Sequence, residues 1–268
     1  MSGPPSGPLA PRSSGPLAPR SGERVRERGS GPQASLGRRV VAEGVGTAFL
    51  LATVIGSGIM AERLAGGNVA LALLANTIAT GAGLLALILT FGGVSGAHFN
   101  PAVSVADASQ GGIAWREVGA YVAAQLLGAF AGVALAHLMF DAPLFSASRH
   151  VRSGFGQLAG EFVATFGLIA VIRGSSRAGA GMTPFAVAAY ITAAYWFTSS
   201  TSFANPAVTL ARAASDTFAG IRPADAPGFI AAQALGAGSA IVLLRWLLPN
   251  RPAVRDGIST IADKENAA

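Results

Sequence analysis

Two short segments of the chain carry the residue types best suited to contacting a solute, and they read almost alike. Segment 95–106 is SGAHFNPAVSVA and segment 200–211 is STSFANPAVTLA. Asn is a favoured helix N-cap, and Pro suits the first helical position because its missing N–H would be unpaired there. Each segment therefore predicts a helix start that presents an amide side chain and the positive end of a helix dipole. The two cores comprise Asn100, Pro101, Ala102, Asn205, Pro206 and Ala207.

Composition excludes most other chemistry. The chain has no Cys, which excludes thiolate metal sites, disulfides and Cys nucleophiles. Its three histidines, His98, His137 and His150, lack metal-ligand spacing, so we expect no metal, no cofactor and no enzymatic activity. The formal net charge of +6 does not indicate nucleic-acid binding, because much of the excess lies in one terminal segment.

The elements that must position the two motifs are apolar. Hydrophobic residues make up 51% of the chain and charged residues only 12%, against roughly 25% charged residues in soluble proteins. The apolar runs approach the length that crosses a bilayer, and the abundant Gly and Ala suit close helix packing in a membrane. We therefore predict an all-α membrane protein embedded in a lipid bilayer. The six predicted spans are 40–60, 68–91, 118–140, 158–172, 183–198 and 228–248.

The two halves of the apolar region repeat each other. Glu43 and Glu161 occupy matching places in the first span of each half, and the pattern Ala-Gln-x-x-Gly recurs at Gln125 and Gln233. Three spans per half place the two copies in opposite membrane orientations. Inverted repeats with broken helices place a functional site near the membrane midplane.

Two half-helices that enter from opposite faces would meet at their N-termini. Each terminus carries roughly half a positive elementary charge, so the pair would repel cations and hydronium but not neutral solutes. The amides of Asn100 and Asn205 would donate hydrogen bonds to a passing hydroxyl, and backbone carbonyls before each Asn would accept them. The carbonyls predicted to line such a pore belong to Gly96, Ala97, His98, Phe203 and Ala204. This arrangement provides no energy source or nucleophile, so passive conduction follows more naturally than catalysis.

The chain divides into a central domain and two tails. Segment 1–38 is rich in Pro, Gly, Ser and Arg and has too few apolar residues to order itself, so we predict a disordered tail. The channel domain is predicted over 39–250, with repeats at about 39–140 and 156–249, and a C-terminal tail over 251–268.

The arginines of the N-terminal tail predict a cytoplasmic N-terminus, and six spans return the C-terminus to the same side of the inner (plasma) membrane. Arg38 and Arg39 could instead indicate a twin-arginine signal, but the apolar run after them recurs later in the chain, which favours a first membrane span. The tail could bind anionic lipid through its charges, or it could be a solvated leader.

The paired cores and their flanking repeats resemble the aquaporin, or major intrinsic protein, superfamily over about residues 38–250. The resemblance implies an aquaporin-like fold of six transmembrane helices and two re-entrant half-helices. It also implies a homotetramer with one channel per protomer and small neutral solutes as cargo. By the same resemblance, Glu43, Glu161, Gln125 and Gln233 anchor the re-entrant loops. The alternatives are a proton relay for the two acids and solute contact for the two amides.

The sequence departs from the family pattern after the second core. Most water and glycerol channels of the family have Arg where this chain has Val208. Arg212 lies one helical turn further on, where it could restore positive potential at the outer mouth or could pair with Asp216. Family spacing assigns the outer selectivity constriction to Thr80, Ala193, Ser202 and Val208. These small side chains predict a wide constriction.

The second core and the loop after it resemble bacterial aquaglyceroporin-like channels of arsenic-resistance operons. This resemblance implies passage of arsenite and other metalloid hydroxides, besides glycerol and water. The alternatives are a general water and glycerol facilitator, a proton-coupled secondary transporter that would use Glu43 or Glu161, and a non-conducting scaffold. His98 could act as a pH gate, although a packing residue that offers its carbonyl to the pore is the simpler interpretation. We assign no role to His150.

Overall fold

All secondary structure in the described part of the chain is helical. The structure, a computed structural model, describes residues 3, 34–179 and 181–248. The helices are α1 (Leu36–Leu64), α2 (Val69–Ser95), α3 (Pro101–Ser109), α4 (Trp115–Met139), α5 (Phe155–Ala178), α6 (Thr183–Phe197), α7 (Pro206–Arg212), the short 3-10 helix η1 (Pro223–Asp225) and α8 (Ala226–Leu247). The predicted all-α fold is confirmed.

Each of the six predicted spans lies on one of the long helices. Among the described residues, five helices are long and apolar enough to cross a bilayer: α1, α2, α4, α5 and α8 with η1. The predicted span at 183–198 forms α6, which has 15 residues. At about 1.5 Å per residue, α6 is shorter than a hydrocarbon core of roughly 30 Å. The inverted repeat nevertheless makes α6 the counterpart of α2.

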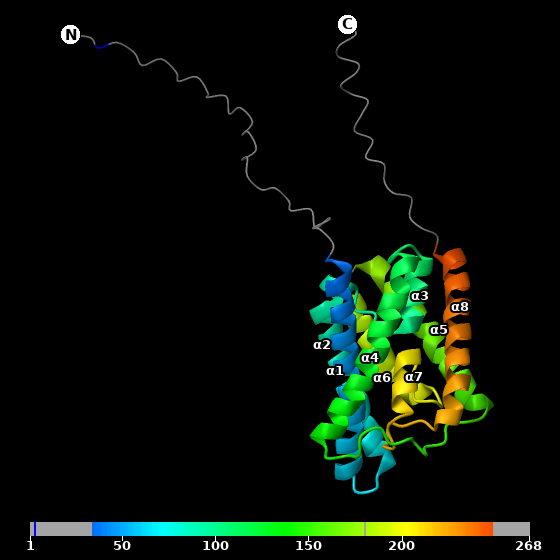
Figure 1. Ribbon diagram of the computed structural model, residues 1–268. Helices are drawn as coiled ribbons and strands as arrows, with labels where there is room; N and C mark the ends of the chain where they lie inside the picture. Colours follow the sequence, from blue (N-terminus) through cyan, green and yellow to red (C-terminus); the bar gives the residue numbers. More distant parts are fainter. Residues whose placement is uncertain (1–2, 4–33, 180, 249–268) are drawn as a thin grey trace. The chain divides into compact units, whose positions relative to one another are not determined.

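The two Asn-Pro-Ala cores start the two shortest α-helices. Pro101 and Pro206 are the first residues of α3 and α7, and the side chains of Asn100 and Asn205 each accept a hydrogen bond from the backbone N–H two residues later. Figure 1 shows α3 near the end of the molecule where α1 starts and α8 ends, here called the proximal end, and α7 nearer the opposite, distal end. The half-helices therefore enter from opposite ends.

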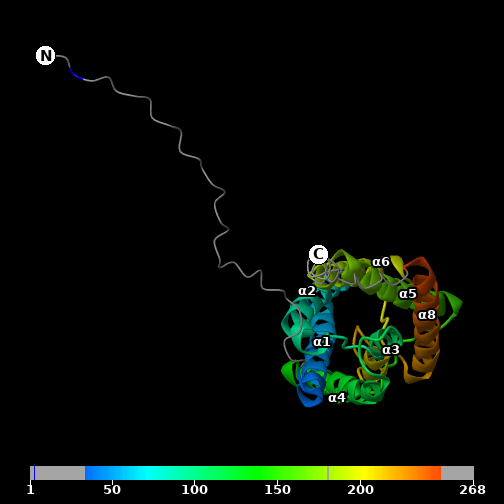
Figure 2. The ribbon, with the colours of Figure 1, turned by 90° about the horizontal axis from the view of Figure 1, so that it is seen from above.

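The long helices pack as two equivalent sets. α1 packs against α2 and α4, and its counterpart α5 packs against α6 and α8. α3 contacts α4, and α7 contacts α8, but each half-helix also contacts the other repeat, α3 through α8 and α7 through α4. Seen from the proximal end, the long helices surround α3 (Figure 2). The sequence repeat therefore builds an inverted structural repeat.

Glycines allow the closest helix crossings within each repeat. A Cβ atom on Gly128 of α4 would clash with the carbonyl oxygen of Gly44 on α1, and a Cβ atom on Gly236 of α8 would clash with the carbonyl oxygen of Phe162 on α5. These are the glycines of the repeated Ala-Gln-x-x-Gly pattern. The pattern therefore encodes backbone contact between helices as well as a polar side chain.

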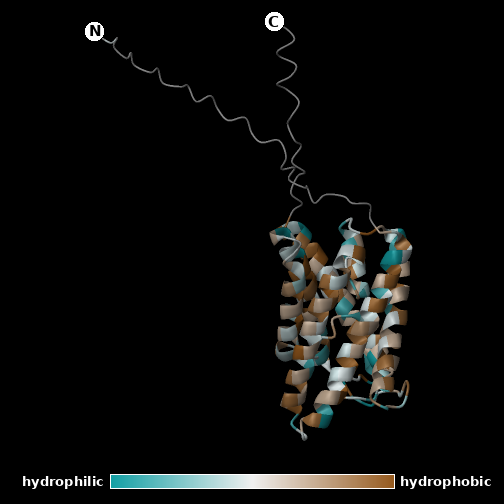
Figure 3. Cartoon of the chain, turned by 90° about the vertical axis from the view of Figure 1, so that its left-hand side faces the viewer, coloured by the Kyte–Doolittle hydropathy of each residue, from teal (hydrophilic) through white to brown (hydrophobic). Residues whose placement is uncertain are grey.

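The outside of the helix assembly is apolar. Large hydrophobic side chains such as Leu127, Phe155 and Trp246 are exposed on α4, α5 and α8, and Figure 3 shows hydrophobic residues along the length of the helices. An exposed apolar surface of this extent is costly in water and suits a hydrocarbon environment. The chain is a multi-pass membrane protein.

The predicted tails lie almost wholly outside the described residues. α1 begins at Leu36 and α8 ends at Leu247, so the helical region starts and stops close to the predicted domain limits of 39 and 250. The predictions for 1–2, 4–33 and 251–268 fall outside the part of the chain that the structure describes.

Candidate functional site

The two half-helices are joined through their N-cap residues. The Asn100 side-chain amide donates to the carbonyl of Ala204 at 2.7 Å, and the Asn205 amide donates to the carbonyl of Phe99 at 2.8 Å. Each Asn thus caps its own helix with its oxygen and binds the opposite segment with its nitrogen. The sequence predicts that these amides donate to a passing solute. In the structure, one N–H of each amide is already used between the repeats, which leaves the other for a solute.

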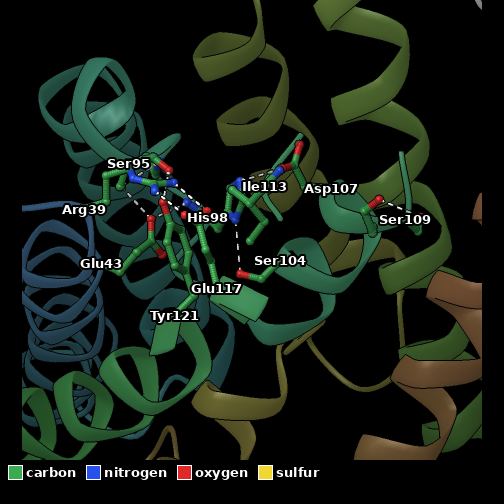
Figure 4. A network of polar contacts seen from close by, with 12 residues as sticks. Arg39, Glu43, Ser95, His98, Ser104, Asp107, Ser109, Ile113, Glu117 and Tyr121 are labelled. Atoms are coloured by element: carbon green, nitrogen blue, oxygen red, sulfur yellow. Dashed lines mark hydrogen bonds and ion pairs between the residues drawn. The ribbon is translucent and has the colours of Figure 1, made fainter. Parts of the chain in front are cut away.

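Glu43 fastens the first re-entrant segment. Its carboxylate accepts the backbone N–H of His98 at 2.9 Å and of Phe99 at 2.7 Å, and also the hydroxyl of Ser95 at 2.6 Å. The Gln125 amide donates to the same carboxylate at 2.8 Å. Figure 4 shows Glu43 beside this segment. A carboxylate that accepts this many hydrogen bonds holds the segment in place.

Glu161 makes the matching contacts in the second repeat. It accepts the backbone N–H of Phe203 at 2.8 Å and of Ala204 at 2.9 Å, and the Gln233 amide donates to it at 2.5 Å. The four residues predicted as loop anchors therefore lie in two equivalent clusters, each between a spanning helix and a re-entrant segment. These contacts favour the anchoring interpretation over the proton relay.

The backbone before each half-helix is strained in the same way. Ala97 and Phe99 in the first segment, and Ser202 and Ala204 in the second, have φ values between 48° and 51°. Such left-handed conformations cost of order 1–3 kcal/mol each and persist only where the surroundings enforce them. The surroundings enforce them here: Glu43 and Glu161 accept the N–H groups of Phe99 and Ala204. The hydroxyls of Ser95 and Ser200 accept those of Ala97 and Ser202.

One cavity of about 450 Å³ passes both cores. Its wall includes Asp107 and Gln110 at the C-terminal end of α3, and Arg212 at the C-terminal end of α7. Because these ends point toward opposite ends of the molecule (Figure 1), the cavity extends from the proximal to the distal side. The cavity therefore runs along the path expected of a transmembrane pore.

The cavity wall combines polar and aliphatic residues. Asn100 and Asn205 line it, as do the predicted carbonyl residues Gly96, Ala97, His98 and Phe203. The spanning helices add aliphatic side chains: Leu50, Val54, Leu84, Ile88, Leu168, Ile169, Ile172, Val187 and Ile191. A solute that presents both hydroxyl and C–H groups fits such a wall.

Ala204 is the one predicted carbonyl residue that does not line this cavity. Its carbonyl accepts the Asn100 amide instead. The position directly before Asn205 is thus used to join the repeats. Spacing alone could not reveal this, because the bond links residues 104 positions apart.

Three of the four predicted constriction residues line the cavity, and one does not. Thr80, Ser202 and Val208 lie in the wall. Ala193 is exposed and absent from it, so its assignment needs correction. The face of α6 that meets the cavity carries Val187, Ile191 and Tyr195; these recur every four residues, and Ala193 lies about half a turn away from them.

Tyr195 replaces Ala193 at this level of the pore. Its hydroxyl donates to the Thr80 hydroxyl at 3.3 Å, while the buried Ser202 hydroxyl has no partner within the described chain. Sequence reasoning missed Tyr195, although its four-residue spacing from Ile191 was a usable signal. The constriction is consequently more polar than four small residues would make it.

Arg212 does not form the ion pair with Asp216 that was one of its two predicted roles. Asp216 binds Arg149 instead, through the Arg149 backbone N–H at 2.9 Å and Nε at 2.8 Å, which lowers the pKa of Asp216. Arg212 is 2% exposed, lines the cavity, and donates from Nε to the carbonyl of Ala219. This placement fits its other predicted role, at the distal mouth.

Arg152 is a second buried cation that sequence reasoning missed. His150 is exposed, but Arg152, two residues further on, is only 9% exposed. Its guanidinium donates to the carbonyls of Gly220 and Ser200 at 2.8 and 3.3 Å. Burial lowers the pKa of Arg152 to about 10, which leaves it charged at neutral pH.

His98 lies at the proximal part of the wall. Its ring packs against Tyr121 with centroids 5.4 Å apart, Nδ1 lies 3.1 Å from the Ser104 hydroxyl, and Nε2 lies 3.7 Å from the Asp107 carboxylate. Figure 4 shows His98 between Tyr121 and Ser104. The contacts on several sides agree with a packing role for the ring.

Fold and site together define a class: multi-pass helical membrane proteins built as an inverted repeat, with a cavity running past two facing Asn-Pro-Ala half-helices. A family model described as major intrinsic protein matches residues 32–191. The chain belongs to the major intrinsic protein family, as its motifs indicated.

Known relatives support this membership. The chain is 57% identical over 221 residues to aquaglyceroporin AqpS of Rhizobium meliloti, covering 82% of this chain and 94% of that protein. It is 35% identical over 180 residues to aquaporin NIP1-3 of Oryza sativa subsp. japonica, covering 65% and 62%. The solved aquaglyceroporin from Plasmodium falciparum matches with a TM-score of 0.56 at 21% identity, covering 78% of this chain and 96% of that one. This last likeness concerns the fold.

Proposed function

We propose that the protein is a passive transmembrane channel for small neutral solutes, with glycerol, water and metalloid hydroxides such as arsenite as its cargo. The observation that carries the proposal is the cavity that passes both Asn-Pro-Ala cores, with a wall of polar and aliphatic residues. A polyhydroxylated neutral solute exchanges its water for the Asn amides and backbone carbonyls. Its C–H surface contacts the aliphatic side chains, which require no hydrogen bonds.

The named relatives point the same way. One is called an aquaglyceroporin and another, 32% identical over 129 residues, is called a glycerol uptake facilitator and comes from Bacillus subtilis. We extend the cargo to arsenite because the trihydroxide is neutral and resembles glycerol in its hydroxyl groups. Val208 supports this extension, since its short side chain leaves more room at the constriction than an arginine would.

A proton-coupled transporter is less well supported. It needs a titratable group at the midplane that is free to exchange protons, and the two candidates, Glu43 and Glu161, are each held by backbone N–H groups and a Gln amide. Flux that is linear in solute concentration and independent of a proton gradient is the expected result. Saturable, proton-driven counterflow would favour the transporter.

Stopped-flow light scattering on proteoliposomes tests the channel. The purified full chain should raise water, glycerol and arsenite permeability above that of protein-free vesicles. Rates at background for all three solutes would contradict the proposal. Val208→Arg serves as the narrowing variant: glycerol and arsenite permeability should fall by about tenfold or more, because the added side chain fills the constriction and its charge must stay buried. Unchanged flux in that variant would remove Val208 from the constriction.

We further propose a homotetramer in the inner membrane, with both chain ends in the cytoplasm. The exposed apolar side chains leave surface for contacts between protomers as well as for lipid. Native mass spectrometry in a gentle detergent should give the mass of four chains. Protease added outside right-side-out vesicles should spare tags at both ends, and cleavage of either tag would overturn the orientation.

A further inference from the structure

We propose that Arg212 is the charge filter of this channel, so that selection by charge and selection by size are separated by one helical turn of α7. The inference rests on the proposed channel function and deepens it. Val208, with Thr80 and Ser202, sets the width of the constriction, while Arg212 supplies the positive potential that excludes cations and protons.

The place of Arg212 on α7 supports this division. Arg212 lies four residues after Val208, so both side chains belong to one face of the half-helix, and both line the cavity. A solute that passes Val208 on the distal side must therefore also pass Arg212. A positive charge in such a low-dielectric wall opposes a cation far more strongly than it would in water.

The hydrogen bonds of Arg212 leave most of its guanidinium available. Among the described residues, the one hydrogen bond of the Arg212 side chain runs from Nε to the Ala219 carbonyl. The guanidinium carbon lies 3.3 Å from the centroid of the Phe203 ring, which holds the group in place from one side. A side chain used only to anchor the Ala219 loop would need a single neutral donor, because burying a charge without a carboxylate partner is costly.

Arg152 adds to the positive electrostatic potential around Arg212. The Arg152 guanidinium lies 5.0 Å from the same Phe203 ring, and its donors bind neutral carbonyls and the Thr201 hydroxyl. In the described ranges no ion pair joins a carboxylate to either guanidinium. The nearby acid, Glu161, already accepts three N–H groups. The distal half therefore holds two buried cations around one aromatic ring.

The inverted repeat provides an internal comparison. Asp107 follows Asn100 by seven residues, as Arg212 follows Asn205, so the two occupy equivalent positions on α3 and α7. Asp107 also lines the cavity, but its carboxylate accepts the backbone N–H of Ile113 at 2.8 Å. The equivalent positions thus carry opposite charges, and only the distal one opposes cations.

The test separates neutral flux from ion leak in the same proteoliposomes. Glycerol permeability is measured by light scattering. Proton leak is measured by a trapped pH dye and K⁺ leak by a trapped K⁺-sensitive dye, each under an imposed membrane potential. For Arg212→Gln we expect the ratio of ion leak to glycerol flux to rise at least about tenfold above that of the parent chain. The half-helix termini remain, so the variant should not become an open ion channel.

Three further variants make the result specific. Arg149→Gln is the matched control, because it removes an exposed arginine that binds Asp216 and does not line the cavity; its leak should equal that of the parent. Arg212→Lys keeps the charge and should keep the leak low. The double variant Val208→Arg with Arg212→Gln moves the charge back by one turn, and should restore exclusion of cations while slowing glycerol.

If Arg212→Gln is not recovered in folded form, Val208→Glu is tested in its place. We again expect a raised ion leak, because the new carboxylate would neutralise the Arg212 guanidinium one turn away. Low ion leak in a folded, glycerol-conducting Arg212→Gln, or in a folded, glycerol-conducting Val208→Glu, would overturn the charge filter. Absence of glycerol flux in the parent chain would contradict the channel itself instead. The two proposals therefore fail in different measurements.

Discussion

Val208 and Ala193 allow a direct test of which side chains face the pore, because the chain has no Cys and any introduced thiol is unique. Val208 lines the cavity, whereas Ala193 lies away from it. Mercurials should leave the parent chain uninhibited. They should block glycerol flux in Val208→Cys and leave Ala193→Cys largely active. Block of Ala193→Cys alone would restore the family assignment and reject the face of α6 described above.

The Glu161 carboxylate fixes the second re-entrant segment by accepting the backbone N–H groups of Phe203 and Ala204. In Glu161→Gln the new amide group would face the N–H groups of Phe203 and Ala204, and each unmet buried group costs roughly 1–3 kcal/mol. We expect a clearly lower thermal midpoint in detergent and a lower yield of folded protein. Glu62→Gln, an exposed position on α1, should behave like the parent chain.

The same variant separates anchoring from proton coupling. If Glu161 were a proton carrier, its replacement would leave stability nearly unchanged and would abolish gradient-driven transport. A variant as stable as the parent would therefore count against the anchoring role. The equivalent contacts of Glu43 predict the same behaviour for Glu43→Gln in the first segment.

At the scale of elements, the crossing of α1 and α4 depends on a position without a side chain. A Cβ atom at Gly128 would clash with the Gly44 backbone, while a Cβ atom at Gly119 on the same helix would meet nothing within 4 Å. Gly128→Ala should therefore lower stability by about 1–3 kcal/mol, the usual cost of overpacking. Gly119→Ala should be neutral or slightly stabilising, because Ala is the better helix former. Thermal unfolding of both variants in one detergent compares them.

The half-helices show why short elements can be rigid. α7 has only seven residues, too few to be stable alone in water. Its start is fixed by Asn205, which binds both its own helix and the opposite segment, and its C-terminal turn by the Arg212–Ala219 bond. Tertiary contacts thus supply the stability that the length of the helix does not.

At the scale of the whole molecule, permeability should not require residues 1–33. The cavity wall lies within residues 50–212, and α1 begins at Leu36. A chain lacking residues 1–33 should insert normally and conduct glycerol at the parent rate per inserted protein. Normal insertion with lost flux would show that the segment acts on the pore.

Local rules determined much of this protein. The helix starts at the two Asn-Pro-Ala cores follow from N-cap and Pro chemistry, which act within one turn. The spans follow from apolar run length, and the inverted repeat follows from the matched order of Glu43, the first core and Gln125 in one half and their counterparts in the other. Each of these depends on residues close together in sequence.

Only the tertiary structure determined the features that depend on contacts between the two repeats. The Asn100–Ala204 and Asn205–Phe99 bonds join residues more than 100 positions apart, so no local pattern contains them. The face that α6 turns to the cavity replaced Ala193 with Tyr195, because helix rotation depends on packing against neighbours. Arg152 and Arg212 are buried without an ion pair to a carboxylate among the described residues. Their burial depends on loops from separate parts of the chain, which meet around Phe203.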